Sequence, residues 1–158
     1  MSERNRQAPT FRVRPATRDD IAFLTRCAEE AYTQYIEAIG KRPAPMDFDF
    51  AGRLNHDTIE VLIADGRRAG YVVWRFKPDC LFLDSIAIGN EWQGKGLARQ
   101  AFDHLERVAR ASRREAIELY TNEAMVANLT LYPHLGFERT GVRNEDGFTR
   151  VYFRKALS

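Results

Sequence analysis

The sequence is poor in the residues that build disulfide frameworks and metal centres. It has two cysteines, Cys27 and Cys80, which lie far apart in no metal-binding spacing, so we expect two buried thiols in a reducing cytoplasm. Its three histidines, His56, His104 and His134, are scattered and form no pair at helical spacing. A disulfide-stapled fold is therefore disfavoured, and no metal site is expected.

The chain also lacks a long apolar run and a strong net charge. No apolar stretch is long enough to span a bilayer, and the first ten residues are polar, without the apolar core of a signal peptide. The formal net charge of +2 is too small for a protein dedicated to binding nucleic acid. We expect a cytoplasmic protein that binds neither a membrane nor nucleic acid.

What is present suits one globular domain with its own core. The chain has 158 residues, of which 44% are hydrophobic. Residues 1–9 are polar and are predicted to form a disordered tail, which leaves residues 10–158 as the single domain.

Hydrophobic periodicity predicts strands and helices that alternate along this domain. A strand, a helix and a second strand follow one another in the middle of the chain, with hairpins before and after them. This order predicts a mixed sheet with helices on both faces, α/β to α+β in class. Strands are expected at residues 11–16, 57–65, 69–76, 80–88, 117–121, 136–143 and 148–155, and helices within 17–40, at 96–112 and within 122–135.

The most informative motif is the glycine-rich stretch GNEWQGKGLARQ at residues 89–100. Gly89, Gly94 and Gly96 lie between a nearly continuous apolar strand and a predicted amphipathic helix. A helix N-terminus presents unpaired amides and a partial positive charge, and glycines allow a ligand to approach the backbone closely. The pattern predicts a loop that holds phosphate; the alternative is that the glycines serve only as turn residues.

Two well-known phosphate loops fit this stretch poorly. Residues 89–95 match the start of a Walker A motif, but Gly96 stands where that motif needs the Ser or Thr that holds magnesium. The dinucleotide fingerprint G-x-G-x-x-G begins at Gly94 and Gly96 but would place its third glycine at Arg99. A nucleotide triphosphatase and a dinucleotide-binding protein are both disfavoured.

A third motif fits better. QGKGLA at residues 93–98 matches Q/R-x-x-G-x-G/A, the pyrophosphate loop of the GNAT superfamily of N-acetyltransferases. LDSIAI at residues 83–88 resembles the strand at which that family's sheet splays, and LYPHLGF at residues 131–137 resembles its downstream helix and strand. The order of elements agrees over residues 11–155, so nearly the whole sequence resembles a GNAT acetyltransferase.

The resemblance implies both a fold and a reaction. The fold would be a single domain with a mixed, mostly antiparallel sheet of about seven strands, splayed at the central strand and flanked by helices on both faces. The reaction would transfer an acetyl group from acetyl-CoA to a primary amine by direct attack on the thioester, without a metal. No cysteine lies in a motif typical of an acetyl-enzyme, which disfavours ping-pong chemistry.

The resemblance also assigns residues to the cofactor. The backbone of residues 86–88 would line the pantetheine and the acetyl carbonyl, and the amides of residues 93–98 would hold the pyrophosphate. Many members carry Asn seven positions before the family's Tyr, but Met125 stands there, and we carry over Asn128 instead. The implied cofactor-binding residues are Ile86, Ala87, Ile88, Gln93, Gly94, Lys95, Gly96, Leu97, Ala98 and Asn128.

Three residues are candidates for acid–base chemistry. Tyr132 matches the family position of the general acid that protonates the CoA thiolate, a role open to a phenol with a reference pKa of ~10. The acceptor amine must first lose a proton, which a carboxylate can accept, often through water. Asp84, which by alternation shares a strand face with Ile86 and Ile88, and Glu123 are the first candidates for that base.

The segment at residues 32–50 is expected to shape the acceptor pocket, because family acceptor pockets form where the first helices and the following loop meet the cofactor. Tyr32, Tyr35, Met46 and Phe48 would form apolar walls, and the acids Glu37, Asp47 and Asp49 lie in the same segment, where the two aspartates would attract a cation.

Two other functions stay open at this point. A non-catalytic acyl-CoA-binding sensor on the same fold would keep the loop and lose the acid. A nucleotide-binding protein would use residues 89–95 as a degenerate P-loop. The identity of the amine, the use of longer acyl donors and a homodimeric state, which is common for this fold, are also left open.

Overall fold

The computed structural model describes residues 8–158, and residues 1–7, most of the expected tail, lie outside the described part. One seven-stranded sheet has the order β1-β2-β3-β4-β5-β7-β6, and only the β4–β5 pair is parallel. This mixed, mostly antiparallel sheet confirms the predicted fold class. The strands are β1 (Phe11–Pro15), β2 (Thr58–Ala64), β3 (Arg67–Phe76), β4 (Cys80–Ile88), β5 (Ala116–Asn122), β6 (Glu138–Glu145) and β7 (Phe148–Ala156).

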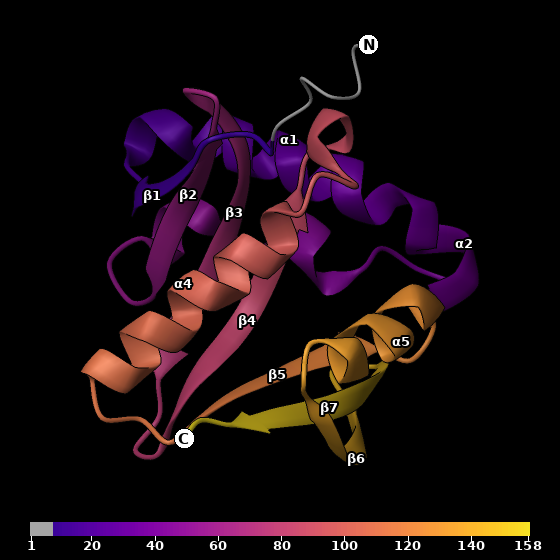
Figure 1. Ribbon diagram of the computed structural model, residues 1–158. Helices are drawn as coiled ribbons and strands as arrows, with labels where there is room; N and C mark the ends of the chain where they lie inside the picture. The colour runs from indigo at the N-terminus through magenta and orange to yellow at the C-terminus, as the bar shows by residue number, and fades with distance from the viewer. Residues whose placement is uncertain (1–7) are drawn as a thin grey trace, which may run out of the picture.

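Helices cover both faces of the sheet (Figure 1). On one face, α4 (Leu97–Ala111) and α5 (Val126–His134) close a core that contains Leu105, Tyr132 and Phe153. On the other face lie α1 (Ile21–Tyr32), α2 (Ile36–Ile39) and α3 (Phe50–Arg53), with α1 and α3 closing a second core. Among the described residues, no helix is long and apolar enough to cross a membrane.

The central strands β4 and β5 are paired over only part of their length. Cys80 to Leu83 pair with Ala116 to Leu119, and beyond these residues the two strands diverge as a wedge (Figure 1). β4 stays paired with β3 on its other edge, and β5 stays paired with β7. The wedge therefore leaves one edge of each strand with main-chain groups that no neighbouring strand occupies.

A β-bulge in β4 changes which face its side chains occupy. The register with β3 passes from Leu83 to Ser85 across consecutive β3 residues, which leaves Asp84 as the extra residue. The alternation that was expected to place Asp84 on the face of Ile86 and Ile88 is therefore broken, and that expectation is wrong. Those two isoleucines pack with the α4 core, whereas the Asp84 carboxylate meets an arginine of α3 on the opposite face.

Asp20 ties the start of α1 to the sheet. Its side chain is 2% exposed and forms ion pairs with Arg14 at 2.8 Å and Arg68 at 3.3 Å, and it accepts a hydrogen bond from the Thr17 amide at 2.9 Å. These contacts, led by the hydrogen bond from Arg14, outweigh burial and hold the pKa of Asp20 well below its usual range.

We expect Asp20→Asn to lower the free energy of unfolding by about 1–3 kcal/mol at pH 7, because it removes charge-assisted hydrogen bonds. Since the folded pKa is depressed, this contribution is present above the unfolded value of ~3.9 and is lost as the pH falls below it. Urea unfolding at pH 7 and pH 3 measures the difference, with the exposed Asp19→Asn as control. An equal cost at both pH values would contradict the account.

Candidate active site

The glycine loop forms an open cradle at the N-terminus of α4. Gly94 (φ +76°) and Gly96 (φ +81°) both adopt left-handed backbone conformations, which side chains resist. The Gln100 amide donates to Gly96 O at 3.2 Å, so the amides of residues 97–99 precede the first hydrogen bond of the helix and have no helical partner. A Cβ at either glycine would meet nothing within 4 Å, so the cradle opens to a ligand.

Not every residue of the motif belongs to this cradle. Gly89 has an ordinary φ of −59° and precedes a 3-10 turn at Asn90–Trp92, so two glycines rather than three shape the loop. The side chain of Gln93 donates to Ile88 O at 3.1 Å and braces the loop against the end of β4. Lys95 is exposed, and its side chain does not line the adjoining groove.

A groove runs from the cradle along the open edge of β4 to α5. Ile86 O accepts a hydrogen bond from the Tyr32 hydroxyl at 2.7 Å, and Ile88 O accepts the bond from Gln93, so these peptide groups face the groove and not β3. Strand alternation points the amides of Ile86 and Ile88 the same way. The predicted residues that line the groove are Ile86, Ala87, Ile88, Gln93, Gly94, Gly96, Leu97, Ala98, Asn128 and Tyr132.

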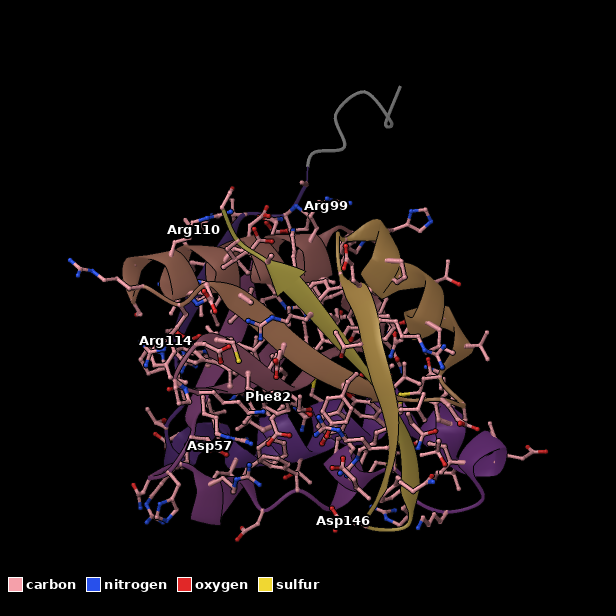
Figure 2. All side chains as sticks on the ribbon, turned by 90° about the horizontal axis from the view of Figure 1, so that it is seen from below. Asp57, Phe82, Arg99, Arg110, Arg114 and Asp146 are labelled. Carbon is pink, nitrogen blue, oxygen red and sulfur yellow. The ribbon has the colours of Figure 1, made fainter. Side chains whose placement is uncertain are left out.

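A second cavity passes through the wedge between β4 and β5. It shares Tyr32, Ile86, Asn128 and Tyr132 with the groove, so the two spaces meet at these residues. In Figure 2, Arg99, which lines the groove, lies on the α4 side of the sheet, and Asp146, at the tip of the β6–β7 hairpin and in the outer hollow next to the cavity, lies on the opposite side. The cavity is further lined by Ile39, Pro43, Ala44, Pro45, Leu83, Asp84, Tyr120, Phe148 and Arg150.

Tyr132 stands at the junction of the two spaces. Its ring packs among three phenylalanines with centroid distances of 5.6–6.0 Å, which fixes its direction. Burial, followed by the neighbouring Tyr32 and Tyr35, raises the pKa of Tyr132 well above its usual value. Within the described residues its hydroxyl makes no hydrogen bond, so it is a protonated donor free to act on a ligand.

The two predicted carboxylates have very different surroundings. Asp84 lines the wedge cavity, where it pairs with Arg53 at 2.8 Å and Arg75 at 3.5 Å and accepts a hydrogen bond from Tyr120 at 3.2 Å. Glu123 is exposed and lines neither the groove nor the wedge cavity. The structure therefore brings Asp84 to Tyr132's cavity and leaves Glu123 outside it.

Asn128 is held at the junction by its own amide group. Its Nδ2 donates to Thr121 Oγ1 at 3.1 Å and approaches Met125 Sδ at 3.7 Å. Met125 itself is 4% exposed and belongs to the wall of the wedge cavity. The hydrogen bond to Thr121 orients the side chain of Asn128, which lines both the groove and the wedge cavity.

The residues of segment 32–50, which was expected to shape the acceptor pocket, line different spaces. Tyr35 lines the groove, whereas Phe48 lies with Asp47 and Asp49 around an outer hollow at the mouth of the wedge cavity. Met46 is buried and lines none of these spaces, so the expected apolar wall does not include it.

Sequence reasoning missed Arg150, which lines both the wedge cavity and the outer hollow. Its side chain is 12% exposed, and its guanidinium carbon lies 4.5 Å from the ring centroid of Tyr120 and 5.6 Å from that of Phe148. The sequence did hold a signal for Arg150. Val151 and Phe153 are core side chains of the same strand, and alternation along a strand places Arg150 on the opposite face.

No three His, Cys, Asp or Glu side chains within residues 8–158 gather in a way that could hold a metal ion.

Comparison with known proteins agrees with the resemblance found in the sequence. A family model described as "Acetyltransferase (GNAT) family" matches residues 24–137. No curated protein gives a significant match.

Several solved structures share the fold. The ribosomal-protein-S18-alanine N-acetyltransferase of Escherichia coli is 18% identical, with a TM-score of 0.74 over 94% of this chain and 95% of that one. A GNAT family acetyltransferase from Elizabethkingia anophelis with acetyl-CoA bound is 15% identical, with a TM-score of 0.72 over 93% and 98%. The PaiA N-acetyltransferase of Thermoplasma acidophilum, in complex with coenzyme A, is 15% identical, with a TM-score of 0.72 over 94% and 99%.

Proposed function

The chain belongs to the acetyltransferase (GNAT) family, and from this premise we propose that it transfers an acetyl group from acetyl-CoA to a primary amine. We take residues 10–158 as one catalytic domain. The observation that carries the proposal is the meeting of the groove and the wedge cavity at Tyr132. A donor in the groove and an acceptor in the cavity would approach each other from opposite faces of the sheet.

The groove offers groups that suit each part of acetyl-CoA. The amides around Gly94 and Gly96, at the positive end of α4, would bind the pyrophosphate. The open edge of β4 would pair with the pantetheine amides, and an amide of Ile86 or Ile88 would donate to the thioester oxygen. Such a donor stabilises the oxyanion that develops during acyl transfer, an effect of about 2.7–4 kcal/mol in comparable sites.

The proposed reaction is a direct displacement. The neutral amine nitrogen attacks the thioester carbonyl carbon, a C–N bond forms, and the C–S bond breaks. Tyr132 donates its phenolic proton to the departing sulfur. Asp84 accepts the proton that the amine loses, through a water molecule, and its contacts with Arg53 and Tyr120 hold the carboxylate toward the cavity.

A thermal-shift titration against acetyl-CoA, CoA and Mg-ATP is the first test. A ligand that binds only the folded state raises stability by about 2.7 kcal/mol at a hundredfold excess over its Kd. We expect a shift with acetyl-CoA and CoA and none with Mg-ATP. A shift with Mg-ATP alone would instead favour the degenerate P-loop.

Release of CoA thiol in the presence of a library of primary amines is the second test. Amine-dependent release identifies an enzyme, and the product should carry an acetyl group on nitrogen by mass spectrometry. Tight acetyl-CoA binding without release for any amine would favour the sensor function. Parallel double-reciprocal lines would contradict direct attack.

A further inference from the structure

Arg150 is positioned differently from the other arginines around the wedge cavity. It is the one basic residue among the described residues that line the cavity itself, and its side chain is 12% exposed. The rings of Tyr120 and Phe148 lie beside its guanidinium and restrict the plane in which it can lie. A guanidinium held in this way presents its donors in a defined direction.

The donors of Arg150 are only partly used. Its contacts with Glu145 at 3.5 Å and Asp146 at 3.3 Å both involve Nη1. Among the described residues, no hydrogen bond uses its Nε or Nη2. By contrast, Arg53 uses both Nε and Nη2 to bind two aspartates. The free side of the Arg150 fork matches the two oxygens of a carboxylate.

The negative charge of the Asp84 carboxylate is balanced by neighbouring arginines. Asp84 is 13% exposed and is engaged by Arg53, Arg75 and the Tyr120 hydroxyl. It therefore presents no unpaired negative charge to an incoming molecule, whereas Arg150 keeps unpaired donors. The free Nε and Nη2 donors of Arg150 favour an acceptor that brings an anionic group of its own.

The size and walls of the cavity favour a small acceptor. Its cavity volume is about 50 Å³, which leaves room only for a small or slender group. Its walls are largely apolar, with Ile39, Pro43, Pro45 and Phe148 facing the space. An apolar group of a few carbon atoms fits these walls.

We propose that the acceptor is a small amino acid with an apolar side chain, and that Arg150 binds its carboxylate while its amine reaches the junction at Tyr132. This inference rests on the proposed acetyl transfer and adds the chemical class of the acceptor. Arg150 acts as a specificity-determining residue and takes no part in bond making.

Matched acceptor pairs that differ only in the carboxylate test the proposal. Release of CoA is measured with L-leucine against 3-methylbutylamine, L-phenylalanine against 2-phenylethylamine, and each amino acid against its amide. We expect kcat/KM to favour the carboxylates roughly 10- to 100-fold, the scale of a charge-assisted hydrogen-bonded pair. In Arg150→Met this ratio should fall toward one, mainly through KM.

Two further variants separate recognition from structure. Arg143→Met removes another arginine that stacks on a tyrosine of the same hairpin, 4.2 Å from the ring centroid of Tyr152, and it lies outside the cavity, so its ratio should stay at the wild-type value. Arg150→Lys keeps the charge without the fork and should give an intermediate ratio. Two results would overturn the proposal. One is a ratio of kcat/KM near one in the wild-type protein; the other is an equal loss of kcat/KM for the amino acid and for its partner without a carboxylate in both Arg150 variants.

Binding distinguishes failure of this inference from failure of the proposed catalysis. If no acceptor is acetylated, the CoA-saturated protein is titrated calorimetrically with the same pairs. Binding of the amino acids alone, lost in Arg150→Met, would support the acceptor class even though the catalytic proposal had failed. Equal binding of both members, or no binding of either, would overturn the acceptor class as well.

Discussion

Replacing Tyr132 by phenylalanine should lower kcat about 10²- to 10³-fold and leave the KM for acetyl-CoA close to the wild-type value. The change removes only the hydroxyl that we propose protonates the departing thiolate, and general acids contribute roughly 10²- to 10⁴-fold. The ring that packs among the phenylalanines of the core remains. Steady-state kinetics with an amine identified by the library screen measures both constants.

The pH dependence gives this prediction a second readout. Because burial raises the pKa of Tyr132 well above ~10, the acid stays protonated through neutral and mildly alkaline pH. The wild-type rate should rise with pH as the amine loses its proton, without a falling limb below pH ~10. The deficit of Tyr132→Phe should therefore be constant from pH 6 to pH 9.

Tyr71→Phe is the matched control for this experiment. Tyr71 is also a buried tyrosine, but its hydroxyl lies 3.1 Å from Ser85 Oγ and lines neither the groove nor the wedge cavity. We expect this variant to be less stable and to keep its kcat. A Tyr132→Phe variant with wild-type kcat would show that another group protonates the thiolate.

Gly96→Ala should raise the Kd for acetyl-CoA about 100-fold. The left-handed φ of +81° at Gly96 aims the amides at the start of α4 into the cradle, and a side chain at this position both strains the backbone and enters the space that the pyrophosphate would occupy. A hydrogen bond to a charged group contributes about 1.5–3 kcal/mol, so weakening one or two of these amide contacts corresponds to roughly 10- to 100-fold or more in Kd. Isothermal titration with acetyl-CoA gives the Kd directly.

Gly66→Ala separates the loss of binding from backbone strain. Gly66, in the turn between β2 and β3, has a φ of +77°, and a Cβ there would also meet nothing within 4 Å. Both alanines should therefore destabilise the fold by a similar amount, roughly 1–2 kcal/mol. Only the change at Gly96 should weaken acetyl-CoA binding, and an equal change in Kd for both variants would refute the cradle.

Much of the fold was predictable because its signals are local. The apolar run of β4 and the apolar stripe of α4 are short-range patterns, and they place the loop between them at a helix N-terminus. The left-handed glycines of the cradle follow from the same segment, since Gly94 and Gly96 are the residues that tolerate this conformation without a side chain.

The bulge at Asp84 could not be predicted in this way. Alternation along an isolated strand put its side chain on the face of Ile86, and only the register with β3 makes Asp84 an extra residue. One inserted residue reverses the face of every side chain that follows it in the strand. Alternation therefore predicts the faces correctly on either side of a bulge but relates the two sides wrongly.

The sequence by itself determined the order of the elements, the glycine loop at the start of α4 and the place of Tyr132 after it, because each depends on residues close together in the chain. The tertiary structure alone decided which charged and polar side chains meet at the wedge cavity. Arg53, Asp84, Tyr120 and Arg150 come from α3, β4, β5 and β7, and they meet only because β4 and β5 separate beyond Leu83. Distances between such remote segments depend on how the strands pair and diverge, which no local pattern records.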